Sequence, residues 1–290
     1  MTSDITIALG LPHTPWIPER VKSFARLRDG LHGPVEHVQL FAERVVEHVQ
    51  VFAERESNRV WPGKLYRWAV STGASHCLQL QDDVIVYEKF WPVLRAMIAA
   101  VPDQILGLEA NHPLGPEMLR TGRRWYRTRA WLVGVGYCWP MSPDLPNGLP
   151  AFLRWCEANP DAVQANNEDS LVNLWAQQHG HDIWHPVPTI IDHDIGVPST
   201  YGNDDHAEYS MYRRPTVTWR DVELRNGWVD PDYWRCALPP LLQGPGTQKC
   251  HFCLQNPAPL HSIRSSARIC PVCAHAFTGA YLGIRQPTPV

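Results

Sequence analysis

The sequence predicts an α/β protein with a mostly parallel sheet flanked by helices, followed by a small cysteine-containing module. Apolar runs of strand length alternate with longer segments of helical spacing, which is the pattern of βα units. The 290 residues, 44% of them hydrophobic, are enough to bury one large core. A Pro- and Gly-rich linker at 239–246 precedes four cysteines at metal-binding spacing. We therefore expect a large domain over residues 1–240 and a zinc-ribbon-like module over 241–290.

The N-terminal segment has the features of a first βα unit. Ile5, Ile7 and Leu9 alternate with smaller or polar neighbours and predict a strand. A turn-rich loop, GLPHTPWIP, follows, and Pro18 suits the first turn of a helix. A helix N-terminus after a strand and a loop is well placed to bind phosphate, although an ordinary βα unit explains the segment equally well.

A short internal repeat follows, with EHVQLFAER at 36–44 and EHVQVFAER at 47–55. The offset of 11 residues is close to three helical turns, so the first copy fits a helix. The second copy fits the second strand equally well. Since the motif occurs only twice in the sequence, it indicates a local duplication, and we assign it no function. Another helix is expected over 61–68, with Pro62 in its first turn.

An acidic pair, Asp82 and Asp83, follows the strand-like run HCLQL. Open α/β sheets bind ligands at the carboxyl ends of their strands, and two carboxylates there can hold a divalent cation together with a diphosphate. Apolar residues from Val84 onward fall near helical spacing, so a helix is expected directly after the pair. Capping of that helix by the two aspartates is the alternative explanation.

A basic loop lies between two further expected strands, at 104–108 and 131–139. Its arginines, interleaved with aromatic residues, fit either an anionic partner such as a nucleic acid backbone or a merely solvated surface. The arginines are Arg120, Arg123, Arg124, Arg127 and Arg129.

Two helices are expected over 149–158 and 166–180. The second begins with Glu168 and Asp169, which suit the positive end of a helix dipole; on that basis we expect a lowered pKa for Asp169. A short apolar strand then ends at His193, and a lone histidine in such a place is more often structural than a ligand.

The cysteine spacing is the most specific pattern in the sequence. Two Cys-x2-Cys pairs are separated by sixteen residues, a spacing that places four thiolates in a tetrahedron around Zn²⁺. The segment from Gly244 onward is too small to fold by hydrophobic burial alone, so the metal is expected to supply its folding energy. Its excess of basic residues also allows a contact with nucleic acid. The expected zinc ligands are Cys250, Cys253, Cys270 and Cys273.

Composition narrows the class of protein. The formal net charge of -3 argues against a uniformly basic coat, as on histones, but allows a local basic patch. Neither a membrane-spanning apolar run nor a cleavable N-terminal signal is recognisable in the sequence. We therefore expect a cytoplasmic protein with no membrane partner, in whose reducing compartment the cysteines bind metal rather than form disulfides.

Three motifs together resemble the GT-A glycosyltransferases, and among them phage-encoded enzymes that glycosylate modified DNA bases are the most similar branch. The motifs are LQDD closing an apolar strand, NEDSLV at a helix start, and DHDIGVPSTYG. The resemblance covers roughly 5–202, and the order and spacing of these short motifs carry it. It implies a nucleotide-binding, Rossmann-like α/β sandwich with a mostly parallel central sheet.

The resemblance also implies a role for each residue of the acidic pair. Asp83 would ligate Mn²⁺ or Mg²⁺ bridging the donor diphosphate, and Asp82 would approach the donor sugar or ribose. Gln81 stands where the family's DxD motif has its first aspartate. Thr14 and Arg20 would contact the nucleotide.

The resemblance implies roles for the residues of two further motifs in the same way. Glu168–Asp169 matches the family's xED motif, in which the aspartate is the general base of inverting members. His193 matches the histidine that completes metal coordination in many members. A divalent cation neutralises the departing diphosphate, and a carboxylate takes the proton of the acceptor hydroxyl.

The function expected from these residues is transfer of a sugar from a nucleoside-diphosphate sugar, UDP-linked, to a hydroxyl group. The expected acceptor is a hydroxymethylated pyrimidine in phage DNA, which places the protein in the host cytoplasm. Alternatives are a glycan or protein acceptor, a non-catalytic zinc-ribbon protein that binds nucleic acid, and a metal-dependent phosphohydrolase or nuclease.

Overall fold

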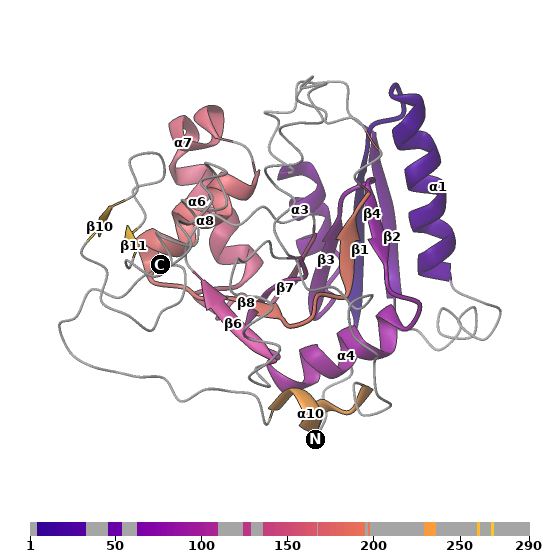
Figure 1. Cartoon of the computed structure of the whole chain (residues 1–290). Coiled ribbons are helices and arrows are strands. Elements are labelled where there is room, and N and C mark those ends of the chain that lie inside the picture. The colour runs from indigo at the N-terminus through magenta and orange to yellow at the C-terminus, as the bar shows by residue number, and fades with distance from the viewer. Residues whose placement is uncertain are drawn as a thin grey trace, which may run out of the picture.

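A computed structural model of the protein describes ten parts of the chain, and every structural statement below concerns these residues. They are 5–32, 46–53, 63–109, 124–128, 136–166, 168–194, 197, 229–235, 260–261 and 268–269. They form a seven-stranded sheet covered by helices on both faces (Figure 1). The strands are β1 (Ile7–His13), β2 (Val46–Ala53), β3 (His76–Leu80), β5 (Ile105–Gly107), β6 (Trp125–Thr128), β7 (Gly136–Pro140) and β8 (Ile183–Pro186).

The sheet has the strand order β2-β1-β3-β7-β5-β8-β6. Strands β2, β1, β3, β5 and β8 point in one direction, whereas β7 and β6 point in the other. The expected mixed α/β fold with a mostly parallel central sheet is therefore confirmed. Because β2 and β3 pair with opposite edges of β1, the chain reverses its direction of progress across the sheet between β1 and β3. Open α/β sheets bind ligands at the carboxyl ends of strands at such a switch point.

Helices cover each face of the sheet over a separate apolar core. Helices α1 (Pro18–His32), α4 (Phe90–Ala100) and α10 (Pro231–Arg235) contribute to one core. Helices α3 (Gly63–Ser71), α6 (Leu149–Ala158) and α8 (Glu168–His179) contribute to the other, and the short α7 (Pro160–Ala165) follows α6. In Figure 1, α1 lies to the right of the strands and α3 to their left.

Alternation of side chains along the strands explains why two cores form. In β1, Ile7 and Leu9 lie in the core under α1 and α4, whereas Ala8 lies in the core under α3. In β7, Cys138 faces the first core and Trp139 the second. The sheet is thus buried on both faces, as a mostly parallel sheet requires.

The segment after the acidic pair differs from the prediction. Val84–Val86 forms a short strand, β4, which pairs antiparallel with β9 (Ile191–His193), and α4 begins only at Phe90 with Lys89 at its N-cap. Three consecutive β-branched residues favour a strand once a partner strand is present. Asp82 and Asp83 therefore do not cap a helix, and that alternative explanation is wrong.

Other sequence predictions have mixed outcomes. The helix at 149–158 is confirmed as α6, and the one at 166–180 is observed as α8. The expected loop at 10–18 is wrong in its first part, because β1 continues through His13 in register with β2 and Ala53 ends that pairing. The second repeat copy lies mostly in β2, so the strand, which was one of the structures that fitted it, is the one observed.

Several predictions lie outside the residues that the structure describes. They concern the first repeat copy, Pro62, the linker at 239–246, three of the basic-loop arginines and the four cysteines of the expected zinc site. Between the two cysteine pairs, β10 (Leu260–His261) and β11 (Arg268–Ile269) pair antiparallel. No helix within the described parts of the chain is long and apolar enough to cross a membrane.

Candidate functional site

The acidic pair lies at the switch point between β1 and β3. Asp82 and Asp83 follow β3 directly after Gln81, and their residue exposures are only 1% and 0%. The carboxyl end of the neighbouring β1 brings His13 and Thr14 to the same place. The position expected from the sequence is therefore the position observed.

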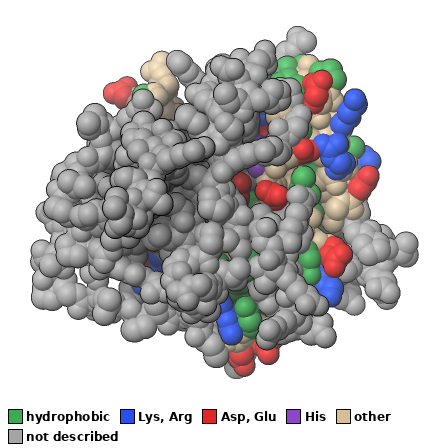
Figure 2. Space-filling view, in the orientation of Figure 1, with side chains coloured by type: hydrophobic (Ala, Val, Ile, Leu, Met, Phe, Trp, Pro, Cys, Tyr) green, Lys and Arg blue, Asp and Glu red, His purple; other side chains and the backbone are tan. Residues whose placement is uncertain are grey.

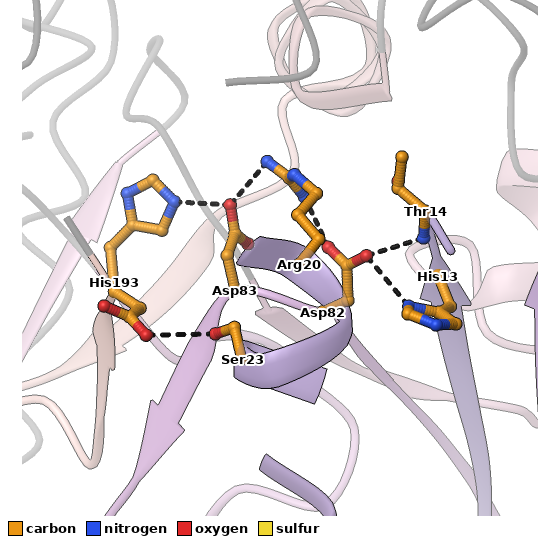
Figure 3. Close-up of polar contacts among 8 residues, drawn as sticks. His13, Thr14, Arg20, Ser23, Asp82, Asp83 and His193 are labelled. Atoms are coloured by element: carbon orange, nitrogen blue, oxygen red, sulfur yellow. Dashed lines mark hydrogen bonds and ion pairs between the residues drawn. The ribbon is translucent and has the colours of Figure 1, made fainter. Parts of the chain in front are cut away.

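Asp82 is engaged by protein donors on both carboxylate oxygens (Figure 3). Its Oδ2 accepts a hydrogen bond of 2.6 Å from the backbone N–H of Thr14 and lies 3.1 Å from Nδ1 of His13. Its Oδ1 accepts a hydrogen bond from Nη1 of Arg20. The His13 ring in turn stacks on Phe24 at 4.2 Å between ring centroids. Asp82 therefore ties the loop after β1, and the first turns of α1, to the end of β3.

Asp83 has a different environment. Its Oδ2 accepts hydrogen bonds of 2.7 Å from Nη2 of Arg20 and of 2.7 Å from Nε2 of His193. Its Oδ1 is buried and has no hydrogen-bond partner among the described atoms. Burial alone would raise the pKa of Asp83, but His193 and Arg20 outweigh it and lower that pKa. Burial likewise opposes protonation of His193, yet Asp83 raises the pKa of this imidazole to about 9.

The pairing of β4 with β9 explains how His193 reaches Asp83. Val84 lies opposite His193 in this ladder, and the backbone N–H of Asp194 donates a 2.7 Å hydrogen bond to the carbonyl of Asp83. The Asp194 carboxylate accepts hydrogen bonds from Ser23, at 3.1 Å, and from Arg26 of α1. His193 is thus brought to the acidic pair by sheet register.

A second pair of carboxyl groups begins α8. Glu168 accepts a hydrogen bond from the hydroxyl of Tyr66 in α3 and lies 3.5 Å from Nε2 of Gln79. Among the described residues, the Asp169 carboxyl group has one long hydrogen-bond contact, at 3.5 Å, with the hydroxyl of Tyr137 in β7. Glu168 is therefore held by more donors than its neighbour.

Both carboxyl groups have raised pKa values. Burial raises the pKa of Glu168 to about 7, against a partial lowering by the Tyr66 hydrogen bond. Burial also raises the pKa of Asp169 well above its usual range, and repulsion from Glu168 and Glu109 adds to this effect. The lowered pKa expected for Asp169 from the helix dipole is wrong, because loss of solvent and neighbouring negative charge outweigh a dipole that contributes only a modest stabilisation.

Glu109, which is 3% exposed, is a further buried acid that was not predicted from the sequence. It stands two residues after β5, at the same edge of the sheet as the acidic pair, and interacts electrostatically with Asp169 and His193. An acidic residue directly after an apolar strand was the available signal, as for Asp82. In the sequence, Glu109 is instead grouped with the polar loop that follows it.

Asp83 and His193 are the described residues best suited to a divalent cation. The buried Oδ1 of Asp83 lacks a hydrogen-bond partner among the described atoms, and a carboxylate and an imidazole that has released its proton are both ligands of Mn²⁺. Across the described parts of the chain, no group of three or more His, Cys, Asp or Glu side chains is arranged to hold a metal. The donor set therefore fits a cation that takes its remaining ligands from water and a bound phosphate, as Mg²⁺ commonly does.

The loop expected over 111–129 is wrong at 125–128, which form strand β6, and two of its arginines have partners within the protein. Arg124 donates to the carbonyl of Tyr233 and lies 3.4 Å from the centroid of its ring. Arg127 pairs with Asp182 at 3.3 Å and lies 5.1 Å from the Trp184 ring. Because their partners lie within the protein, these two arginines stabilise the fold around β6 and β8. In the view of Figure 2, the coloured surface carries basic and acidic side chains interspersed.

Asp82, Asp83, Glu168 and Asp169 are the acidic residues of the two motifs, and they lie in one site. Three further residues that were expected in this site also lie there. Thr14 and Arg20 contact Asp82, His193 contacts Asp83, and Asp83 acts electrostatically on Asp169. In comparisons with known proteins, no protein-family model and no curated protein matches this sequence.

Proposed function

We propose that the protein is a metal-dependent glycosyltransferase that moves a sugar from a nucleoside-diphosphate sugar to a hydroxyl acceptor. The observation that supports this most is the convergence of two carboxyl pairs with different environments at one switch point. Asp83 has a lowered pKa and Asp169 a raised one, and the two interact electrostatically. Two carboxyl groups whose pKa values differ in this way suit two roles in one site. The group with the lowered pKa stays ionised and binds a ligand, and the group with the raised pKa accepts a proton.

The donor would bind at the carboxyl ends of β1 and β3. A divalent cation bound by Asp83 and His193 would neutralise charge on the diphosphate leaving group. Arg20, fixed beside both aspartates, adds a second positive charge at the same place. Asp82 orients this arginine and the loop through Thr14. That engagement favours a positioning role for Asp82 over direct contact with sugar or ribose.

Asp169 would take the proton of the acceptor. As the acceptor oxygen bonds to the anomeric carbon, the bond from that carbon to the diphosphate oxygen breaks, and the hydroxyl proton passes to the Asp169 carboxylate. A raised pKa makes the ionised carboxylate a stronger base than an ordinary aspartate. Glu168, held by Tyr66 and Gln79, would orient the first turn of α8.

For the acceptor we propose the hydroxymethyl group of a modified pyrimidine in DNA. Support comes from the resemblance in sequence to phage-encoded DNA-base glycosyltransferases, and from the basic segment with its two cysteine pairs. Zn²⁺ bound by these cysteines would order that segment. Binding of such an acceptor should weaken steeply as salt increases, because phosphate contacts release counterions. Weak salt dependence would favour a glycan or protein acceptor instead.

A thermal-shift screen of nucleoside diphosphates, each with and without Mn²⁺, tests the donor site. A ligand that binds the native state raises the unfolding midpoint by mass action. We expect UDP to stabilise the wild type in the presence of Mn²⁺ and to lose this effect in Asp83→Ala. Asp144→Ala, which removes an exposed carboxylate, is the matched control and should behave as wild type.

Transfer itself is tested with the same protein and a labelled UDP-sugar. Asp83→Ala, Asp169→Ala and His193→Ala should abolish transfer while the protein stays folded. Retained turnover in Asp169→Ala would remove the general-base assignment. Failure of every nucleoside diphosphate to shift the midpoint would instead favour the non-catalytic nucleic-acid-binding alternative.

A further inference from the structure

The contact with the most unusual chemistry in the site is the one made by Arg20. Its guanidinium lies between the two adjacent carboxylates, with Nη1 on Asp82 and Nη2 2.7 Å from Oδ2 of Asp83 (Figure 3). The exposed fractions of the three side chains are 6%, 2% and 0%. A buried, permanently charged cation therefore already occupies the acidic pair that is proposed to bind a metal ion.

The local structure holds this arginine firmly in place. Pro18 opens α1, and the carbonyl of Ile17 accepts hydrogen bonds from the backbone N–H groups of Arg20 and Val21, at 3.0 Å and 3.1 Å. One turn further along α1, Ser23 binds Asp194 at 3.1 Å. The first turns of α1 are thus fixed by their own hydrogen bonds and by the link from Ser23 to Asp194, which leaves the guanidinium little freedom to leave the acidic pair.

We propose that Arg20 is a resident counter-cation that competes with the divalent cation for Asp83 and so weakens metal binding to the site. This inference rests on the proposed function only in taking Asp83 as the metal ligand. The guanidinium shares Oδ2 of Asp83 with His193 and leaves Oδ1 as the oxygen without a hydrogen-bond partner. A second cation at Oδ1 would lie a few ångströms from the guanidinium, where repulsion between positive charges is strong in a buried site.

The same contact explains how two adjacent carboxylates can be buried side by side. An ionised carboxylate loses much solvation on burial, and removing the partner of a buried ion pair leaves that loss uncompensated. Arg20 therefore stabilises the metal-free protein and opposes metal binding for one physical reason. Its removal should change both properties, in opposite directions.

Binding of Mn²⁺ alone, measured by electron paramagnetic resonance of the free ion, tests the competition. We expect the affinity of Arg20→Gln for Mn²⁺ to be at least about tenfold higher than that of wild type, since a nearby buried positive charge is lost. Arg28→Gln is the matched control, because it removes the same charge from an exposed position of α1 where the partner is Asp29. Its affinity for Mn²⁺ should stay within about twofold of wild type, because exposed charges are screened.

The unfolding midpoint gives a second readout that does not depend on turnover. Without metal, Arg20→Gln should melt roughly 5 °C or more below wild type, and saturating Mn²⁺ should restore more of its stability than it adds to wild type. If Arg20→Gln does not fold, Arg20→Lys replaces it, since a lysine cannot bind both carboxylates in the planar fork of a guanidinium. Its affinity for Mn²⁺ should then exceed that of wild type.

The outcomes separate this inference from the proposed function. Binding of Mn²⁺ by wild type, with equal or weaker binding by the Arg20 variant, overturns the competition and leaves the metal-dependent donor site intact. Binding by the Arg20 variant alone supports the competition and argues against metal dependence of the natural protein. Absence of binding in both means that Asp83 is not a metal ligand, and both ideas are then wrong.

Discussion

Glu168 and Asp169 show how much two neighbouring carboxyl groups can differ. Glu168 accepts hydrogen bonds from Tyr66 and Gln79, whereas the Asp169 carboxyl group contacts Tyr137 alone among the described residues. The adjacent position of the two acids could be predicted from the sequence. The direction of their pKa shifts could not, because it depends on burial and on Glu109, which lies far away in the sequence.

The pH dependence of transfer should report the Asp169 carboxyl group. Because the pKa of Asp169 is raised, kcat/KM is expected to increase with pH until this group is ionised. Tyr137→Phe removes a hydrogen bond that lowers this pKa, so the increase should move to higher pH. Glu168→Gln removes a negative charge that raises it, so the increase should move to lower pH by about one unit.

If Asp169 is the titrating group, the pH at which kcat/KM increases should move in opposite directions in Tyr137→Phe and Glu168→Gln. Tyr87→Phe is the control, as Tyr87 is a buried tyrosine of the core on the face of the sheet opposite α8. Displacement in the same direction for Tyr137→Phe and Glu168→Gln would mean that Asp169 is not the titrating group.

At the scale of single elements, β3 begins with a buried histidine that should make stability depend on pH. Burial lowers the pKa of His76 below its ordinary value of 6.5, although its hydrogen bond to the carbonyl of Pro102 partly opposes this. The unfolded chain then binds a proton more readily than the folded one. Stability contributed by a neutral His76 is therefore complete above pH 6.5 and is lost as the pH falls below that value.

Urea unfolding between pH 7 and pH 5 measures this contribution. In wild type the free energy of unfolding should fall with a slope of at most about 1.4 kcal/mol per pH unit from this group. His76→Gln should show a shallower fall, whereas His179→Gln, at an exposed position, should keep the wild-type slope. Equal slopes in His76→Gln and wild type would assign the acid sensitivity to other groups.

Helix α10 should contribute more stability than its five residues suggest. Trp234 is fully buried in the core under α4, and its carbonyl accepts a 3.0 Å hydrogen bond from Nε1 of Trp125. Trp234→Ala should lower the free energy of unfolding by about 3–5 kcal/mol, the usual cost of removing a buried aromatic side chain. Asp232→Ala in the same helix removes an exposed side chain and should change it by about 0.5 kcal/mol or less.

Element prediction failed where a distant partner decides the structure. Val84–Val86 has helical spacing with the residues after it, yet it is a strand because β9, from a distant part of the chain, pairs with it. Helix α6 was predicted at its observed bounds, because its apolar positions and Pro150 encode it locally. Local patterns predict such elements well, and long-range pairing decides the others.

At the scale of the whole molecule, the two expected domains should respond differently to loss of metal. Cys270→Ser should abolish stoichiometric zinc binding and expose the segment after residue 240 to protease, because thiolate ligands supply the folding energy of such a small module. UDP binding by the larger domain should be unchanged. Zinc content by mass spectrometry and limited proteolysis measure the two effects, and loss of UDP binding as well would make the module part of the catalytic core.

The α/β class and the position of the acidic pair followed from the sequence, because strand-length apolar runs and their carboxyl ends are local features. The residues that surround the acidic pair could not be predicted from the sequence. His13 and Arg20 meet Asp82 because β1 and β3 are adjacent in the sheet, and only the strand order establishes that adjacency. A site assembled at a switch point is encoded by topology as much as by motif.

The pairing of β4 with β9 has an evolutionary consequence. His193 stands between two aspartates, Asp192 and Asp194, and the register of this short ladder decides which of the three lies opposite Val84. Insertion or deletion of one residue before β9 would exchange the imidazole nitrogen for a carboxylate oxygen and turn the side chains to the other face. If the site binds a metal as proposed, its preference would thereby shift from transition metals to Mg²⁺ or Ca²⁺ without any substitution at the acidic pair.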